Sequence, residues 1–158
     1  MCGKSPQKYL GALHAGLSGV YAYPGTPSTE ITEYIQQSPF ARERGVRSRW
    51  CTNEKTAMEA ALGMSYAGKR ALVCMKHVGM NVCADAFVNA AVTGVKGGLV
   101  VLAADDPSMH SSQNEQDSRF YGKFALVPIL EPSDLPVSTG NSPWCPSWSR
   151  PTSRKPTT

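Results

Sequence analysis

Several familiar signatures of metal and catalytic sites are missing from this sequence. Its five cysteines include no C-x-x-C pair, so the spacing typical of zinc and iron–sulfur sites is absent. It also lacks a G-x-G-x-x-G fingerprint, a P-loop and a nucleophile elbow, which leaves Rossmann, P-loop and serine-hydrolase sites unsupported. A cysteine nucleophile, Cys51 or Cys83 acting with His77, stays open as an alternative, although isolated cysteines are usually structural.

Long apolar runs are scarce as well. The longest, Leu99–Ala104, is far shorter than the ~20 residues of a membrane-spanning helix, and the first residues lack the apolar core of a signal peptide. The odd, scattered set of thiols is typical of free cysteines in a reducing compartment. We therefore expect a cytoplasmic protein with no membrane segment.

Excess charge is nearly absent from most of the chain. The net charge is +4, but residues 136–158 hold three basic residues and no acidic one, which leaves 13 basic and 12 acidic residues in 1–135. A nearly neutral body argues against the basic surface of a nucleic-acid-binding protein.

The composition changes at the end of the sequence. Of the last 23 residues, 14 are Ser, Thr or Pro, and no period of a helix or strand is visible there. We expect residues 135–158 to be a low-complexity tail that is disordered in isolation. It is either a linker or an out-of-frame end, and we favour the second because the helical pattern expected after Asp134 never arrives.

Residues 9–134 are expected to form one domain with its own core. Their apolar spacing predicts helices over 9–16, 27–38, 54–64 and 82–93, and strands over 20–23, 46–51, 71–75, 98–104 and 125–130. This alternation indicates an α/β fold with three αβα layers and a mostly parallel sheet. The run at 98–104 is typical of a parallel strand that is buried on both faces.

Polar segments directly follow the predicted strands, at residues 24–28, 52–54, 76–81 and 105–119. Ligands of such sheets bind beyond the carboxyl ends of the strands, so these segments should share one rim. The candidate functional residues of this rim are Thr26, Glu54, His77, Asn81, His110 and Arg119. A cluster of four arginines in 42–49 is either a solvated surface, which we favour, or an anion site.

Glu54 has two interpretations. Asn53 is a good N-cap for the helix over 54–64, and a carboxylate in the first turn is stabilised by ~0.3–1 kcal/mol against the helix dipole. Alternatively, Glu54 is a buried carboxylate that hydrogen-bonds a heteroaromatic cofactor. Thr26 is similarly ambiguous, because it precedes Pro27 and is a candidate N-cap as well as a candidate ligand contact. Local pattern alone does not decide either case.

Five strings of the sequence carry a family resemblance, at residues 23–31, 53–55, 75–82, 94–100 and 104–119. They resemble the amino-terminal domain of the indolepyruvate:ferredoxin oxidoreductase alpha subunit, within the thiamine-diphosphate-dependent 2-oxoacid:ferredoxin oxidoreductases. The resemblance extends over about residues 9–134. It implies a pyrimidine-binding domain of the thiamine-diphosphate type.

The resemblance also implies roles for the rim residues. Glu54 would bond N1′ of the aminopyrimidine and favour the imino tautomer, whose nitrogen takes the proton from the thiazolium carbon. His77 and Asn81 would approach the pyrimidine ring, and packing roles for both stay open. Thr26, His110 and Arg119 would contact the substrate, with a surface role as the alternative for Arg119.

The implied reaction converts an aryl pyruvate such as indolepyruvate, coenzyme A and oxidised ferredoxin into acyl-CoA, carbon dioxide and reduced ferredoxin. The implied assembly contains a beta subunit and paired thiamine domains. A second thiamine domain, which holds the diphosphate through magnesium, and a ferredoxin-like domain with 4Fe–4S clusters have no counterpart in these residues. We therefore expect the chain to be inactive alone. A subunit of a thiamine-dependent 2-oxoacid decarboxylase and a non-catalytic remnant are the alternatives.

Overall fold

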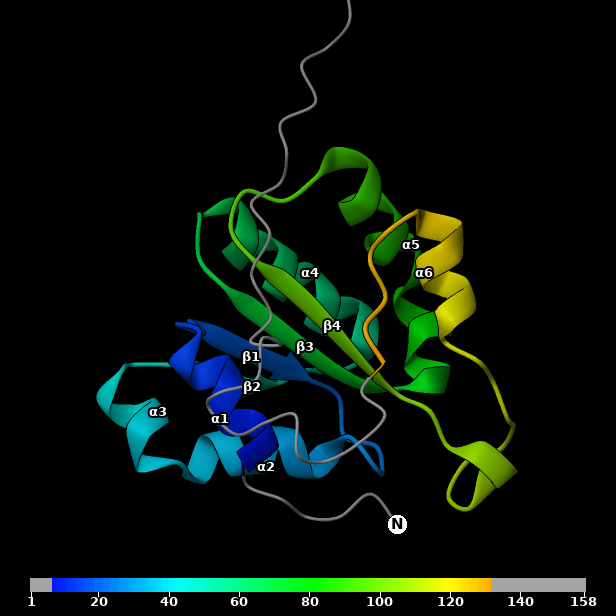
Figure 1. Ribbon diagram of the computed structural model, residues 1–158, viewed down its shortest axis with the longest axis horizontal. Coiled ribbons are helices and arrows are strands. Elements are labelled where there is room, and N and C mark those ends of the chain that lie inside the picture. Colours follow the sequence, from blue (N-terminus) through cyan, green and yellow to red (C-terminus); the bar gives the residue numbers. More distant parts are fainter. Residues whose placement is uncertain (1–6, 132–158) are drawn as a thin grey trace, which may run out of the picture.

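The protein is built around a parallel sheet of four strands. The computed structural model describes residues 7–131, with residues 7–10 described by their backbone alone, so the predicted tail at 135–158 lies outside the described part. The strands are β1 (Gly19–Ala22), β2 (Arg47–Trp50), β3 (Ala71–Lys76) and β4 (Leu99–Ala104), in the order β2-β1-β3-β4 (Figure 1). All three pairings are parallel, which confirms the predicted sheet type.

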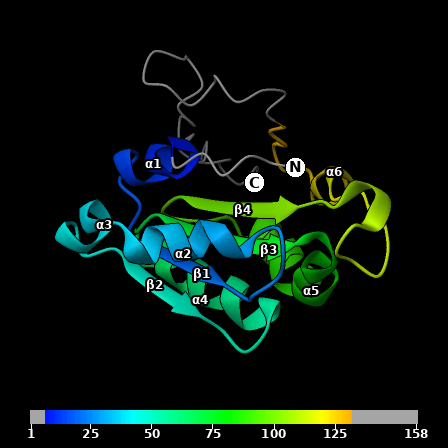
Figure 2. The ribbon, with the colours of Figure 1, turned by 90° about the horizontal axis from the view of Figure 1, so that it is seen from below.

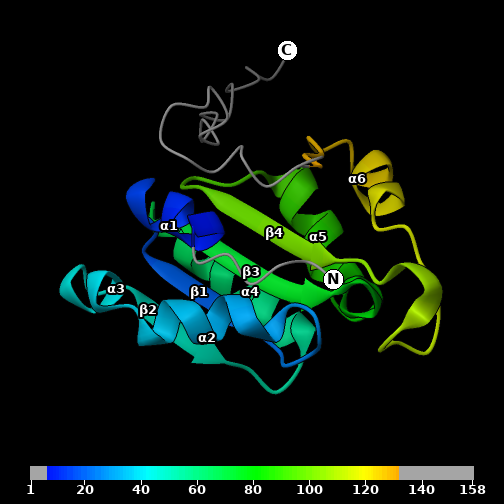
Figure 3. The ribbon, with the colours of Figure 1, turned by 60° about the horizontal axis from the view of Figure 1, so that its bottom comes forward.

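Helices cover both faces of this sheet (Figures 2 and 3). One face carries α1 (Gln7–His14), α2 (Thr29–Gln37) and α3 (Pro39–Glu43), and the other carries α4 (Glu54–Tyr66) and α5 (His77–Thr93). A short helix, α6 (Arg119–Ala125), packs against α5. The three-layer αβα prediction is therefore confirmed.

The alternation of side chains along β3 divides the core in two. Leu72 and Cys74 pack with α1 to α3, whereas Val73 and Met75 pack with α4 and α5. Because successive residues of a strand point to opposite faces, a continuous apolar run is needed wherever both faces are covered. All five apolar residues of β3 are buried, as expected for a central strand.

The strand β4 differs from its prediction in one respect. Its pairing with β3 is parallel, as expected, but each of its six residues is only half-buried. The reason is its position, since β4 is the outer strand of the described sheet, with β3 as its sole neighbour there. The prediction that both faces are fully buried is wrong for these residues.

Two other predicted elements are wrong. Residues 76–81 do not form a loop, because α5 begins at His77, whose side chain is fully buried. The predicted strand at 125–130 is absent, because α6 ends at Ala125 and Leu126 adopts a left-handed conformation with φ of 55°. The amide of Val127 then donates to the carbonyl of Gly122 and closes the helix end.

Thr26 is not the N-cap of α2. That position belongs to Ser28, and the helix begins at Thr29 rather than at Pro27. The preceding turn satisfies its own polar groups, since the Ser28 hydroxyl donates to the Gly25 carbonyl at 2.7 Å and the Gly25 amide donates to Thr29 Oγ1 at 2.8 Å. Thr26 is left exposed on the turn.

None of the helices over residues 7–131 combines the length and the apolar character needed to cross a bilayer.

Candidate functional site

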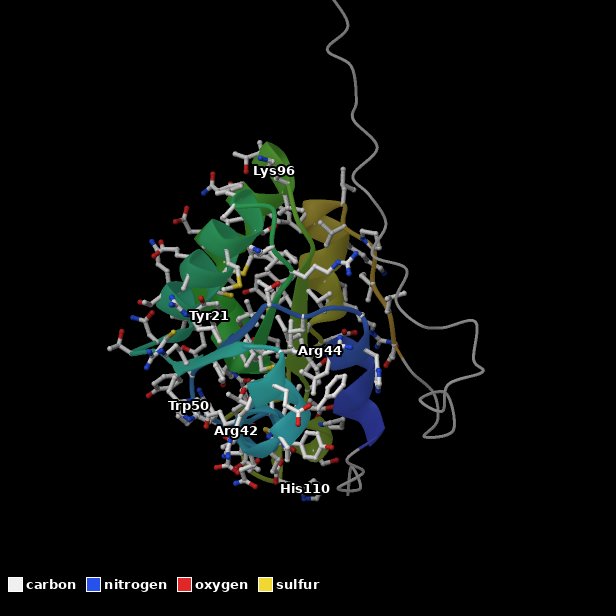
Figure 4. All side chains as sticks on the ribbon, turned by 90° about the vertical axis from the view of Figure 1, so that its left-hand side faces the viewer. Tyr21, Arg42, Arg44, Trp50, Lys96 and His110 are labelled. Atoms are coloured by element: carbon white, nitrogen blue, oxygen red, sulfur yellow. The ribbon has the colours of Figure 1, made fainter. Side chains whose placement is uncertain are left out.

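The predicted polar segments meet at the carboxyl ends of the strands. Residues 105–119 leave the end of β4 and return to α6 beside α5 (Figure 1). His110, in this segment, lies at the opposite end of the molecule from Lys96, which precedes β4 (Figure 4). The parallel pairing of all four strands is the reason that the segments following them gather on one rim.

Glu54 opens α4 at this rim and is buried. Asn53 caps the helix, with its Oδ1 accepting from the Thr56 amide at 2.8 Å, as predicted. Only 8% of the Glu54 surface is exposed, and within residues 7–131 its carboxylate makes no hydrogen bond or ion pair. A buried carboxylate is normally paired or hydrogen-bonded, because removing its charge from water is costly. Neither carboxylate oxygen is among the fully buried unpaired atoms, so the Glu54 carboxylate remains reachable from the rim.

The first turn of α5 closes over Glu54. A Cβ atom added at Gly79 would lie 2.6 Å from Glu54 Cγ and 2.8 Å from its Oε1, which is closer than non-bonded atoms approach. Glycine at position 79 thus makes the space in which the Glu54 side chain lies. The sequence offered no signal for this contact, because the two residues are joined only by the packing of α4 against α5.

The cysteines near Glu54 are poor nucleophiles. Burial, with a smaller contribution from the charge of Glu54, raises the pKa of the Cys83 thiol to about 12. Burial also raises the pKa of Cys51. Because the thiolate is the reactive form of cysteine, these shifts argue against the nucleophile that the sequence left open.

His77 lies fully buried at the start of α5. Its Nε2 is 3.1 Å from both the carbonyl and the side-chain oxygen of Asn114, so Nε2 carries the proton that is shared with these acceptors. The other ring nitrogen, Nδ1, is buried and has no partner among the described residues. The ring therefore retains an unused acceptor when it is neutral.

Gln116 and Asn81 join the 105–119 segment to α5. The Gln116 amide donates to the His77 carbonyl at 3.2 Å, and the Asn81 amide donates to Gln116 Oε1 at 3.0 Å. Asn81 Oδ1 also accepts from the Tyr121 hydroxyl. The structure thus places His77 and Asn81 in one hydrogen-bonded network.

Two aspartates that the sequence analysis did not single out shape the same segment. Asp106 Oδ2 accepts from the Ser111 amide at 2.8 Å and from the Ser112 hydroxyl at 2.8 Å, and these bonds lower the pKa of Asp106 to about 2. Asp105 accepts from both the amide and the hydroxyl of Ser118. The run of serines that follows Asp105 and Asp106 is the signal that was available in the sequence.

The three predicted substrate residues occupy different surroundings. The Thr26 carbonyl accepts from the Ser111 hydroxyl at 3.4 Å, which brings the 24–28 turn against the 105–119 segment. The His110 side chain is exposed. Arg119 is exposed as well and pairs with Asp117 at 2.8 Å and Glu131 at 3.0 Å, which raises its pKa. A hydrogen bond thus joins Thr26 to the 105–119 segment through Ser111, whereas Arg119 lies in a separate ion cluster.

The four arginines of 42–49 lie exposed on the surface around α3 and β2. The Arg44 guanidinium stacks over the Phe40 ring at 4.3 Å and donates to the Leu13 carbonyl (Figure 4). The interpretation as a solvated surface is confirmed.

A family model described as pyruvate flavodoxin/ferredoxin oxidoreductase, thiamine diphosphate-binding, matches residues 10–104. The chain belongs to this family. The match covers four of the five strings and, together with the relatives below, confirms the resemblance.

Curated relatives with this region are much longer than the chain. Indolepyruvate oxidoreductase subunit IorA of Thermococcus kodakarensis is 54% identical over 123 residues, which cover 78% of this chain and 19% of the relative. The protein of the same name from Archaeoglobus fulgidus is 50% identical over 127 residues, covering 79% of this chain and 20% of the relative. The chain thus spans about one fifth of the length of these relatives.

A solved structure shares the fold. The 2-oxoglutarate:ferredoxin oxidoreductase from Magnetococcus marinus, with 2-oxoglutarate, coenzyme A and succinyl-CoA bound, superposes with a TM-score of 0.55 and 25% identity. The similarity covers 66% of this chain and 18% of that chain.

Among the rim residues of this family member, Glu54 has the chemistry to bond an aminopyrimidine. Such a ring offers nitrogen acceptors and an amino donor, and the Glu54 carboxyl group, which has no partner among the described residues, can pair with both kinds of group. The His77 ring is fully buried, whereas the carboxylate oxygens of Glu54 are not fully enclosed and remain reachable from the rim.

Proposed function

We propose that this chain supplies the pyrimidine-binding part of a thiamine-diphosphate-dependent 2-oxoacid:ferredoxin oxidoreductase acting on aryl pyruvates such as indolepyruvate. The observation that carries the proposal is the buried, partnerless carboxylate of Glu54 beneath Gly79. Membership of the thiamine-diphosphate-binding family supports the cofactor, and the names of the relatives support the substrate class.

Glu54 has a defined task in this proposal. Its carboxyl group holds a proton at N1′ of the aminopyrimidine, which shifts the ring toward the imino tautomer that abstracts the proton at the thiazolium carbon. Thiamine diphosphate supplies the nucleophilic carbon and the electron sink of the reaction. Within residues 7–131 no hydrogen bond or ion pair competes with the ring for the Glu54 carboxylate.

The neighbouring residues complete the site. His77 and Asn81 are proposed to lie beside the pyrimidine ring of the cofactor. Gln116 bonds both residues and fixes them relative to the 105–119 segment. Thr26, His110 and Arg119 are proposed to contact the 2-oxoacid. In this proposal residues 9–134 are the functional domain.

The complete enzyme requires parts that correspond to the remaining four fifths of the relatives. Magnesium, the diphosphate contacts and 4Fe–4S clusters belong there in our proposal, and coenzyme A, ferredoxin, a beta subunit and a paired thiamine domain are the proposed partners. The cytoplasm is the proposed location, which suits the free thiols of Cys51, Cys74 and Cys83.

Calorimetry tests the proposal directly. Thiamine diphosphate with Mg²⁺ is titrated into the purified chain, first alone and then together with the subunits that complete the oxidoreductase. We expect weak binding to the chain alone, tight binding to the assembly, and ferredoxin reduction when indolepyruvate and coenzyme A are added.

Two outcomes would replace the proposal. Release of carbon dioxide from indolepyruvate without ferredoxin reduction would indicate a decarboxylase subunit. Failure to bind the cofactor in both titrations would indicate a non-catalytic remnant.

A further inference from the structure

Lys76 is a half-buried cation at the rim to which the proposed function assigns no role. It is the last residue of β3 and the N-cap of α5, and its side chain lies between the 24–28 turn and the 105–119 segment. A Cβ atom added at Gly25 would meet its Cδ at 3.3 Å, so the 24–28 turn packs on the lysine stem. Its ammonium donates to the Ser111 carbonyl at 2.7 Å.

The charge of Lys76 has no carboxylate partner within residues 7–131. Its single hydrogen bond there, to Ser111, uses one of the three ammonium donors. Two other cations near this end of the sheet are already paired, Lys55 with Asp85 at 3.1 Å and Arg119 with Asp117 and Glu131. Lys76 is thus a rim cation whose charge is not neutralised by any carboxylate of residues 7–131.

Thr26 lies on the other side of the same contact. Its carbonyl accepts from the hydroxyl of Ser111, the residue whose carbonyl receives the Lys76 ammonium. The Thr26 hydroxyl is without a partner in the part of the chain that the structure describes. The Lys76 ammonium and the Thr26 backbone therefore contact one residue, Ser111, and both the ammonium and the Thr26 hydroxyl have donors to spare.

We propose that Lys76, together with the Thr26 hydroxyl, binds the carboxylate of the 2-oxoacid in the seam between residues 24–28 and 105–112. The inference rests on the proposed function and adds the cation that recognises the acid group of the substrate. A carboxylate there would receive a charge-assisted hydrogen bond from the ammonium. The positive end of the α5 dipole, at which Lys76 lies, favours the same charge.

Unreactive probes test this contact in the assembled oxidoreductase saturated with thiamine diphosphate and Mg²⁺. Calorimetry gives the Kd of 3-phenylpropionate, which carries the carboxylate, and of 3-phenylpropionamide, its neutral counterpart. We expect the wild type to prefer the carboxylate by roughly tenfold or more, as is typical of a hydrogen bond to a charged group. In K76M, which keeps the apolar stem under Gly25, we expect the preference to fall to about onefold, and K76R should restore most of it.

A matched control is Lys96→Met, because Lys96 lies at the opposite end of the molecule (Figure 4) and should leave the preference unchanged. If K76M retains the carboxylate preference, or if R119Q removes it while K76M does not, the Lys76 inference is wrong. If K76M fails to assemble with the other subunits, Thr26→Val provides the test. It should lower the carboxylate preference several-fold, and an unchanged preference would refute the proposed carboxylate site.

Turnover of phenylpyruvate separates this inference from the proposed function. A wild type that reduces ferredoxin with phenylpyruvate yet shows no carboxylate preference refutes only the role of Lys76. A wild type that neither turns over phenylpyruvate nor binds the probes refutes the proposed function and this contact together.

Discussion

The carboxylate of Glu54 and the guanidinium of Arg119 are charged groups in opposite surroundings. Glu54 is 8% exposed and makes no polar contact among residues 7–131, whereas Arg119 is exposed and paired with two carboxylates. A buried group without a partner is costly in the folded chain, and a paired group on the surface contributes little to stability. The unpaired carboxylate supports the proposed ligand contact of Glu54, whereas the charge of Arg119 is already partly satisfied by Asp117 and Glu131.

The largest expected effect follows from Glu54→Gln. In the assembled oxidoreductase we expect kcat with indolepyruvate to fall by about 10²–10⁴-fold, because an amide can hydrogen-bond N1′ but cannot transfer a proton to it. Urea unfolding should show equal or greater stability, because the substitution removes a buried charge that has no partner. Glu59→Gln, on the exposed side of the same helix, is the control and should leave kcat unchanged. Full activity of E54Q would refute the proposed catalytic role of Glu54.

Gly79→Ala tests the packing of α5 against the Glu54 side chain. The new methyl group would lie 2.6 Å from Glu54 Cγ, so we expect a loss of ~1–3 kcal/mol in the free energy of unfolding and weaker thiamine diphosphate binding. Gly63→Ala in α4 meets no atom within 4 Å and should instead gain ~0.5–1 kcal/mol from helix propensity. Chemical denaturation of both variants measures these changes. Equal shifts in the free energy of unfolding would show that position 79 does not require glycine.

Asp106 sharpens the comparison, because it is a carboxylate whose oxygen is fully bonded. Its pKa in the folded chain is about 2, below the ordinary value of 3.8, owing mainly to the bond from the Ser111 amide. The unfolded chain therefore binds more protons between these values, and the stabilisation is complete above pH 3.8 and lost as the pH falls toward 2. We expect Asp106→Asn to be less stable than the wild type at pH 7, by a margin that shrinks toward pH 2. Urea midpoints measured across this range provide the test, and a constant margin would contradict it.

The smallest stability effect is expected for Arg119→Gln. Its partners are exposed and screened by solvent, so the urea midpoint should move less than in any variant above. The pKa of Asp117, which Arg119 lowers through a side-chain hydrogen bond, should rise toward its ordinary value in an NMR titration. A large loss of stability would show that the Arg119 cluster is a structural centre and not a surface feature.

Much of the fold was predictable from the sequence, because apolar periodicity reports which faces are covered. The runs at β3 and β4 and the cap at Asn53 all led to correct elements. The start of α5 was missed, since Lys76 to Asn81 contains polar residues and a glycine that resemble a loop. Burial of His77 and packing of Gly79 against Glu54 decide that this stretch is helical, and neither is visible locally.

The candidate site was predictable in part. The sequence identified Glu54, His77 and Asn81, because each follows a strand of a parallel sheet. It did not identify Lys76, whose importance depends on the absence of a nearby carboxylate within the described residues. It also left two roles open for Arg119, as a substrate contact or as a surface residue. The pairing of Arg119 with Glu131, twelve residues away, is visible only in the structure.

The sequence by itself determined the αβα layers, the parallel sheet, the rim on which the polar segments meet and the family to which the chain belongs. Those features follow from periodicity and from strings of residues that are adjacent in the chain. Only the tertiary structure decided which charged groups on that rim are already paired, because Glu54, Lys76 and Arg119 acquire or lack partners through residues distant in sequence.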